Sequence, residues 1–276
     1  MCDIIIVYKS KISITEEKNM LSSHKKQYHI NVAEGEVGKY CILPGDPGRC
    51  EKIASYFDNP YHVSTNREYN IWNGYINGEL VSVCSTGIGG PSTAIAVEEL
   101  AMCGVHTFIR IGTCGGISLD VKSGDIVIAS GAVRQDGTSH EYAPPEFPAV
   151  PDADVLFALR EAARDLEYSN HTGVVQAKDS FYGQHSPARM PIAGALQAKW
   201  EAWKRLGVLA SEMESSTLFT VGSFLRVRTG SVFTCVWNQE RFNAGLDTND
   251  DETHDTTSGI RVAIKAIEKL IESDRK

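Results

Sequence analysis

The chain has 276 residues, and its 27 lysines and arginines against 35 aspartates and glutamates give a formal net charge of −8. This acidic balance argues against a nucleic-acid binder, although a local group of arginines could still bind a small anion. No apolar run reaches the ~18–20 residues that cross a bilayer, and the N-terminus lacks the features of a signal peptide. The seven cysteines form no CxxC pair, which predicts a cytoplasmic protein with reduced thiols.

Strands and helices are predicted to alternate along the first half of the chain. Residues 1–28 are mostly polar, and we expect them to form an extension beside a single domain of residues 29–276. Asn77-Gly78 separates two apolar runs, which is a strong signal for a β-hairpin. The predicted elements are a strand at 40–43, a helix at 49–57, paired strands at 69–76 and 80–85, a helix at 92–103, and strands at 107–111 and 125–129.

The second half continues this alternation and ends in an amphipathic helix. Trp200 and Trp203 lie three residues apart on a predicted helix, and we expect them to pack. Glu212 and Glu214 would point ~200° apart if both were helical, so we expect them not to share one role. The pattern predicts an α/β fold with a mostly parallel sheet plus antiparallel hairpins. The predicted elements are a helix at 154–166, a strand at 172–177, helices at 196–206 and 213–225, a strand at 231–236, and a C-terminal helix with an apolar stripe over 260–271.

Three glycine-rich segments follow predicted strands, at the edge where open α/β sheets bind ligands. They are PGDPGR at 44–49, STGIGGPS at 85–92 and RIGTCGG at 110–116. Glycines let backbone N–H groups approach an anion, and Arg49 and Arg110 supply charge and bidentate geometry for phosphate. Thr113 adds a hydroxyl. The chain lacks both the GxGxxG spacing of dinucleotide folds and the Gly-Lys-Ser/Thr of Walker loops, so neither of these two classes is indicated.

These segments belong to a longer ordered series of motifs. The series is LPGDP at 43–47, RE at 67–68, CSTGIGGPST at 84–93, VEEL at 97–100, RIGT at 110–113, EFPAV at 146–150, DSFY at 179–182 and EMES at 212–215. On these motifs the chain resembles the uridine phosphorylase branch of the nucleoside phosphorylase superfamily, from about His29 to the C-terminal helix. The resemblance implies a single-domain, three-layer α/β/α fold with a mixed, partly barrel-like central sheet. It also implies reversible phosphorolysis of uridine to uracil and ribose 1-phosphate in nucleoside salvage, with deoxyuridine and thymidine as open alternatives.

The resemblance also implies how phosphate and ribose are bound. Phosphate would be held by Gly45, Arg49, Arg110 and Thr113, with Arg67 contributed by a neighbouring subunit. Ribose would be held by Glu214, Thr113, the Met213 backbone and His29, which would reach across a dimer interface.

For the base and the assembly, the resemblance implies further roles. Phe181 would stack by the base and Gln184 would read its amide edge, so that Arg110, Glu214 and Gln184 form the catalytic set. Glu68, Ile88 and Ser92 fall where relatives hold a monovalent cation, such as K⁺, between subunits. The implied partners are uridine, phosphate and a second copy of the chain, with hexamers also open.

The implied residues suit the chemistry of glycosidic cleavage. The sugar passes through an oxocarbenium-like state, so a phosphate fixed beneath it serves as both nucleophile and counter-charge. The leaving pyrimidine carries negative charge, so hydrogen-bond donors aimed at its carbonyl oxygens stabilise the transition state. The Gln184 amide can donate and accept. This reaction requires no cofactor beyond phosphate.

The sequence departs from the family pattern at the base site. Ser186 stands where many relatives carry an arginine, and Gln239 follows Asn238 where relatives carry a second one. Purine-cleaving relatives have an aspartate at the place of Asn238, and an asparagine cannot protonate a leaving purine. The alternatives are a purine nucleoside phosphorylase, a nucleosidase that uses water, or a non-catalytic nucleoside-binding protein. Arg49, Arg67 and Arg110 together favour phosphate over water as the attacking group.

Overall fold

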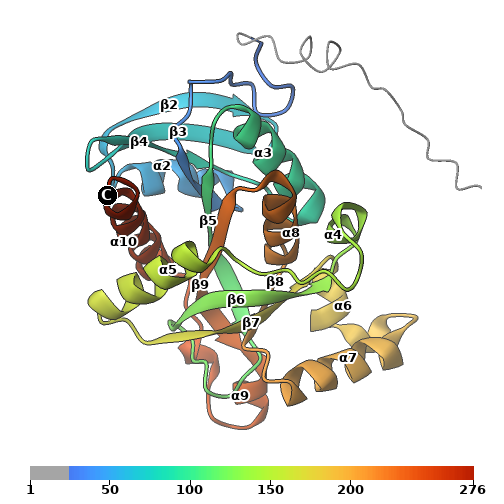
Figure 1. Ribbon diagram of the computed structural model, residues 1–276. Coiled ribbons are helices and arrows are strands. Elements are labelled where there is room, and N and C mark those ends of the chain that lie inside the picture. The colour runs from blue at the N-terminus through green and yellow to red at the C-terminus, as the bar shows by residue number, and fades with distance from the viewer. Residues whose placement is uncertain (1–24) are drawn as a thin grey trace, which may run out of the picture.

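The computed structural model describes residues 25–276, which form a central sheet between two layers of helices (Figure 1). Helices α3 (Gly90–Met102), α4 (Thr138–Tyr142) and α8 (Ser215–Leu225) lie on one face. Helices α2 (Cys50–Ala54), α5 (Ala153–Asp165) and α10 (Thr257–Asp274) lie on the other. Each face has its own buried apolar cluster, which is the packing expected of a three-layer α/β/α domain.

Nine strands form one mixed sheet in the order β2-β3-β4-β1-β5-β8-β7-β6-β9. Strand β5 pairs with β8 and also with β9, so β5, β8, β7, β6 and β9 close into a barrel. This closure confirms the partly barrel-like sheet that the sequence resemblance implied. The strands are β1 (Tyr40–Pro44), β2 (Asp58–Asn66), β3 (Tyr69–Ile76), β4 (Glu79–Cys84), β5 (Thr107–Gly116), β6 (Ile126–Gln135), β7 (Asn170–Lys178), β8 (Ala210–Glu212) and β9 (Arg228–Asn238).

Short helical segments surround one end of the barrel. Helices α6 (Phe181–His185) and α7 (Ala193–Arg205) follow β7, and α9 (Gln239–Asn243) follows β9 directly. The 3₁₀ turns are Pro47–Arg49, Pro187–Arg189 and Asn249–Asp251. These segments lie beside the strand ends that carry the glycine-rich motifs, so they are placed to wall a ligand site.

Three predicted boundaries near the motifs were wrong. The glycines of residues 112–116 continue strand β5 and do not form a loop, because Gly116 lies so close to β9 that a Cβ would come within 2.4 Å of Asn238 Nδ2. The helix predicted from residue 213 begins at Ser215, with Glu214 at its N-cap and Glu212 in strand β8. The helix predicted at 49–57 ends at Ala54.

Two strands carried no usable sequence signal. Strand β2 is a mostly exposed edge strand that contains Pro60, so its apolar residues do not alternate. Strand β8 has three residues and is defined by its neighbours β5 and β7.

Most of the predicted N-terminal extension, residues 1–24, lies outside the described residues. From Lys25 onward the chain packs on the domain, and Ile30 and Val32 are fully buried in the same apolar cluster as helix α3. Within residues 25–276 the six cysteines are all free and buried, and none of the helices is long and apolar enough to cross a membrane.

Candidate active site

Two adjoining cavities open at one end of the barrel. The larger has a volume of about 870 Å³ and the smaller about 440 Å³. Gly115, Lys178, His185 and Trp237 line both, so the two cavities meet at the ends of strands β5, β7 and β9. Together they have the size and concave shape of a small-molecule site.

The glycine-rich motifs form the wall of the larger cavity. Gly45 follows strand β1, and a Cβ on it would lie 3.1 Å from the Gly87 carbonyl oxygen and 3.9 Å from Arg110 Nη1. Gly87 itself adopts a φ of +66°, which L side chains rarely tolerate. Arg49 is half-buried at the end of the 3₁₀ turn, with its Nε 3.8 Å from Asp46 Oδ2. Because the two loops approach each other closely, their backbone N–H groups and the guanidinium groups of Arg49 and Arg110 surround one space in the larger cavity.

A buried charge cluster lies behind these loops. Arg110, in strand β5, has its Nε 3.3 Å from Glu212 Oε2, and its Nη2 donates to Glu214 Oε2. The other oxygen of Glu214 accepts from the Gly89 N–H at 2.7 Å. Arg110 Nη1 is buried and has no hydrogen-bond partner among residues 25–276. Because a buried donor without a partner is costly, this atom is available for an anion in the larger cavity.

Glu212 and Glu214 therefore contact the same arginine, whereas the sequence expectation placed their side chains in nearly opposite directions. That expectation assumed that both residues were helical, whereas one ends a strand and the other precedes a helix. Glu212 also accepts the backbone N–H groups of Glu214 and Ser215, each at 2.9 Å. Burial raises the pKa of the Glu212 carboxyl above its ordinary value, and the Arg110 charge opposes that rise. Glu212 thus fixes Arg110 and the start of helix α8.

The structure brings most of the predicted ligand residues to these cavities. Gln184, on helix α6, lines the smaller cavity, and its Oε1 accepts a hydrogen bond from Ser211 Oγ at 2.7 Å. The predicted residues that line the larger cavity are Gly45, Arg49, Ile88, Arg110, Thr113, Phe181, Met213 and Glu214.

His29 and Arg67 do not line either cavity of their own chain. His29 Nδ1 lies 2.6 Å from Glu99 Oε1, and the His29 backbone carbonyl accepts from Asn66 at 2.6 Å. The Arg67 guanidinium lies over the Tyr28 ring, 5.8 Å from its centroid. The two residues predicted to serve a neighbouring subunit are therefore grouped on one surface.

The predicted cation residues also lie beside the site. Ser92 Oγ donates to Glu68 Oε1 at 2.6 Å, and this hydrogen bond lowers the pKa of the Glu68 carboxyl. Ile88 is exposed at the rim of the larger cavity. Within residues 25–276 no three histidine, cysteine, aspartate or glutamate side chains are grouped as metal ligands.

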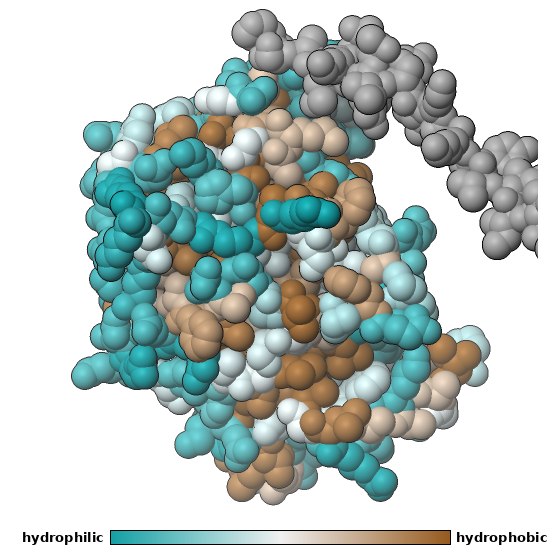
Figure 2. Space-filling model, in the orientation of Figure 1, coloured by the Kyte–Doolittle hydropathy of each residue, from teal (hydrophilic) through white to brown (hydrophobic). Residues whose placement is uncertain are grey.

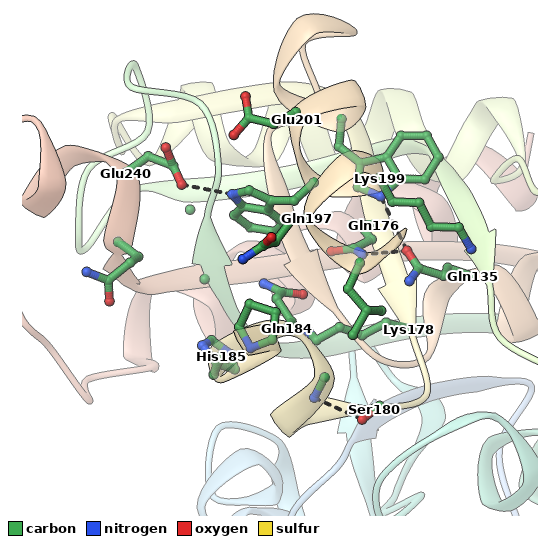
Figure 3. A pocket seen from close by; sticks show the side chains of 18 of the residues that line it. Gln135, Gln176, Lys178, Ser180, Gln184, His185, Gln197, Lys199, Glu201 and Glu240 are labelled. Carbon is green, nitrogen blue, oxygen red and sulfur yellow. Dashed lines mark hydrogen bonds between the residues drawn. The ribbon is translucent and has the colours of Figure 1, made fainter. Parts of the chain in front are cut away.

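Several residues of the smaller cavity were missed by sequence reasoning (Figure 3). Lys178, at the end of strand β7, is 4 % exposed and donates to Ser211 Oγ at 2.6 Å. Gln176, two residues earlier, has a buried Oε1 without a hydrogen-bond partner in the described part of the chain. Trp200 and Trp203 line this cavity as well, so packing alone does not describe them. One signal was available: residues two apart on a strand face the same side, so a polar pair at the end of β7 can point to one site.

The arginines near the predicted base site do not reach the cavities. The Arg189 guanidinium lies over the Tyr182 ring at 5.2 Å, and Arg241 pairs with Asp247 at 2.8 Å. Asn238 is fully buried as the N-cap of helix α9, and its amide nitrogen donates to the Ser118 and Val121 carbonyls. It lines neither cavity, so it contributes structure rather than base contacts.

Comparison with known proteins agrees with this geometry. The family model "Phosphorylase superfamily" matches residues 39–272, and the chain belongs to that family. The chain is 54% identical to a protein named uridine phosphorylase from Treponema pallidum, over 90% of this chain and 95% of that one. It is 40% identical to a uridine phosphorylase from Haemophilus influenzae, over 88% and 98% of the two chains. It is also 39% identical to a guanosine phosphorylase from Halorubrum lacusprofundi, over 89% and 99%.

Proposed function

We propose that this chain catalyses the reversible phosphorolysis of uridine to uracil and ribose 1-phosphate in nucleoside salvage, as a pentosyltransferase. The observation that carries the proposal is Arg110, which pairs with Glu214 on one side and leaves a buried, unpartnered Nη1 at a cavity walled by glycine loops. The similarity to two proteins named uridine phosphorylase supports the choice of uridine.

Phosphate binds among Gly45, Arg49, Arg110 and Thr113 in this proposal. The free donor of Arg110 offers a charge-assisted hydrogen bond, and the backbone at Gly45 can approach an oxygen closely. Holding the anion beneath the sugar converts a bimolecular step into a positioned one. The bond from the anomeric carbon to the base breaks, a phosphate oxygen bonds to that carbon, and the electron pair leaves with the base.

Ribose binds through Glu214, with Thr113 and the Met213 backbone beside it. Glu214 is buried and its two oxygens already accept from Arg110 and from the Gly89 N–H, so its orientation is fixed before substrate arrives. Sugar hydroxyls can donate to the remaining lone pairs of this carboxylate. The same arginine thus links the phosphate and sugar sites.

The base lies between Phe181 and the glutamines of the smaller cavity. Gln184 offers its amide nitrogen, and Gln176 Oε1 offers an acceptor for a ring N–H. Uridine is our proposed substrate, and deoxyuridine and thymidine are to be compared with it. A purine substrate has support from the guanosine phosphorylase relative, and because Asn238 lines neither cavity, its lack of a carboxylic acid does not argue against a purine.

The active form proposed here is a homodimer that shares its active sites, with a hexamer as a further option. His29 and Arg67 support this proposal because they lie together outside both cavities of their own chain. Tyr28 is exposed next to His29, and Ile88 is exposed at the rim of the larger cavity. Figure 2 shows apolar side chains in several patches among polar ones over the middle and lower part of one face.

A monovalent cation such as K⁺ is proposed to bind at the dimer interface near Glu68, Ile88 and Ser92. The Glu68 carboxylate and the Ser92 hydroxyl are oxygen ligands, which suit such an ion. The reaction itself needs no cofactor besides phosphate. A cytoplasmic location is also proposed, in keeping with six free thiols among the described residues.

One assay tests the proposed function. The protein is incubated with uridine, with and without phosphate, and uracil release is followed. Release that requires phosphate is expected. Release at the same rate without phosphate would indicate a nucleosidase, and the absence of release would indicate a binding protein. Inosine, guanosine and thymidine in parallel reactions test the base preference, and faster cleavage of a purine nucleoside than of uridine would overturn the choice of pyrimidine.

A further inference from the structure

Lys178 is a buried cation at the junction of the two cavities. It is the last residue of strand β7, it is 4 % exposed, and it lines both the larger and the smaller cavity. Lys178 belongs to none of the sequence motifs on which the family resemblance rests. Burying an ammonium group is costly, so a lysine at this place calls for a reason beyond packing.

The charge of Lys178 has no ion-pair partner within residues 25–276. The two buried carboxylates nearby, Glu212 and Glu214, are both bound to Arg110. An ammonium has three N–H donors, and Lys178 directs one of them to Ser211 Oγ at 2.6 Å. Two donors are therefore left for a ligand at the place where the cavities meet.

The hydrogen bonds around Lys178 also orient Gln184. Ser211 accepts from Lys178 and donates its own proton to Gln184 Oε1 at 2.7 Å. The amide oxygen of Gln184 is thus engaged by Ser211, and the amide nitrogen is left for the cavity. Figure 3 draws Lys178 and Gln184 among the side chains around the smaller cavity. The ammonium and the amide nitrogen form a donor pair at the base site.

We infer that Lys178 donates a hydrogen bond to a carbonyl oxygen of the pyrimidine and stabilises the negative charge that this base acquires as it leaves. When the bond between the anomeric carbon and N1 breaks, its electron pair passes to N1 and spreads onto the ring carbonyl oxygens. A phosphate oxygen forms the new bond to the anomeric carbon, and no proton needs to move from Lys178. The inference rests on the proposed phosphorolysis of uridine.

The ammonium suits this task because it acts in a site shielded from water. A fixed charge aimed at developing negative charge is worth far more there than in solvent, and it needs no reorganisation during the reaction. Arg189 lies over the Tyr182 ring and Arg241 pairs with Asp247, so neither arginine reaches the base. Within the described residues, Lys178 is the buried cation at the place where the two cavities meet.

Lys178→Met tests this role because it keeps the length of the side chain and removes the charge. We expect kcat/KM for uridine to fall by about 100-fold or more, as when a preorganised donor to an oxyanion is removed. The loss should be at least about tenfold smaller for 5-fluorouridine, because the fluorine itself stabilises the departing anion. The matched control is Lys122→Met, which removes an exposed lysine that lines neither cavity and should change neither rate appreciably.

Three outcomes decide the matter. A wild-type protein that releases no uracil contradicts the proposed function, whereas the role of Lys178 is judged only against an active wild type. A folded Lys178→Met with near-normal rates, or with equal losses on uridine and 5-fluorouridine, overturns the inference. Lys178→Gln also lacks the charge but can still donate to Ser211, so it supplies the same comparison should the methionine variant fail to fold.

Discussion

Replacing Lys178 with methionine measures how much stability the protein gives up to keep a buried charge. Burial lowers the pKa of Lys178 from 10.5 to about 8, and the Glu212 and Glu214 charges offset only part of this effect. At about 1.4 kcal/mol for each tenfold change in proton affinity, the difference corresponds to about 3 kcal/mol. The methionine variant avoids this cost but loses the hydrogen bond to Ser211, which is worth about 1 kcal/mol.

The sign of the effect depends on pH. Below pH 8 the ammonium is charged in both the folded and the unfolded chain, so its full burial cost is present. Between pH 8 and 10.5 the unfolded chain binds a proton that the folded chain lacks, so the stability of the wild type rises with pH. We therefore expect Lys178→Met to be more stable than wild type by about 2 kcal/mol at pH 7, an advantage that disappears toward pH 10.5.

Urea unfolding at several pH values, at one fixed protein concentration, measures this difference. Burial lowers the pKa of His185 on helix α6 and raises the pKa of Cys114 on strand β5, and the Lys178 charge acts on both groups, so the measured difference also contains these smaller contributions. Lys122→Met serves as the control, because that lysine is exposed and its removal should leave the pH dependence unchanged. A methionine variant that is less stable than wild type at pH 7, or a difference that does not change with pH, would refute the reasoning.

The charge cluster and the shared site give three more predictions. Arg110→Ala should lower uridine phosphorolysis by about 1,000-fold, measured as uracil release, because it removes the free guanidinium donor; near-normal turnover would place the phosphate site elsewhere. Glu212→Gln should raise KM for phosphate several-fold and leave KM for uridine nearly unchanged, because Glu212 holds the arginine that is proposed to bind phosphate; equal changes in both constants would argue against this positioning role. Mixing inactive His29→Ala and Arg110→Ala subunits should restore about a quarter of wild-type activity, because half of randomly mixed dimers contain one intact site of two. No recovery despite demonstrated subunit exchange would contradict a site shared across the dimer.

Much of the larger cavity could be predicted from the sequence because its residues belong to contiguous motifs. Gly45 and Arg49 lie in one turn, and Arg110 and Thr113 lie three residues apart on one strand. In such motifs the spacing along the chain also sets the spacing in space, so recognising the string amounts to recognising the geometry. Met213 and Glu214 were found for the same reason.

The smaller cavity was harder to predict because strands and helices distant in sequence build it. Gln135 ends strand β6, Gln176 lies on β7, and Trp203 lies on α7, yet Gln176 Nε2 and Trp203 Nε1 both donate to Gln135 Oε1. No local pattern marks any of them. Arg189 and Arg241 follow Ser186 and Gln239 closely in the chain, but both have other partners in the fold.

The sequence by itself determined the class of fold and the alternation of strands and helices, and it pointed to residues that line the larger cavity. Local patterns of apolar residues and glycines carry this information. Only the tertiary structure decided that Glu212 and Glu214 share Arg110, and that Lys178 is buried where the cavities meet. The physical reason is that burial and charge pairing depend on which strands become neighbours when the barrel closes, and closure joins segments that are far apart along the chain.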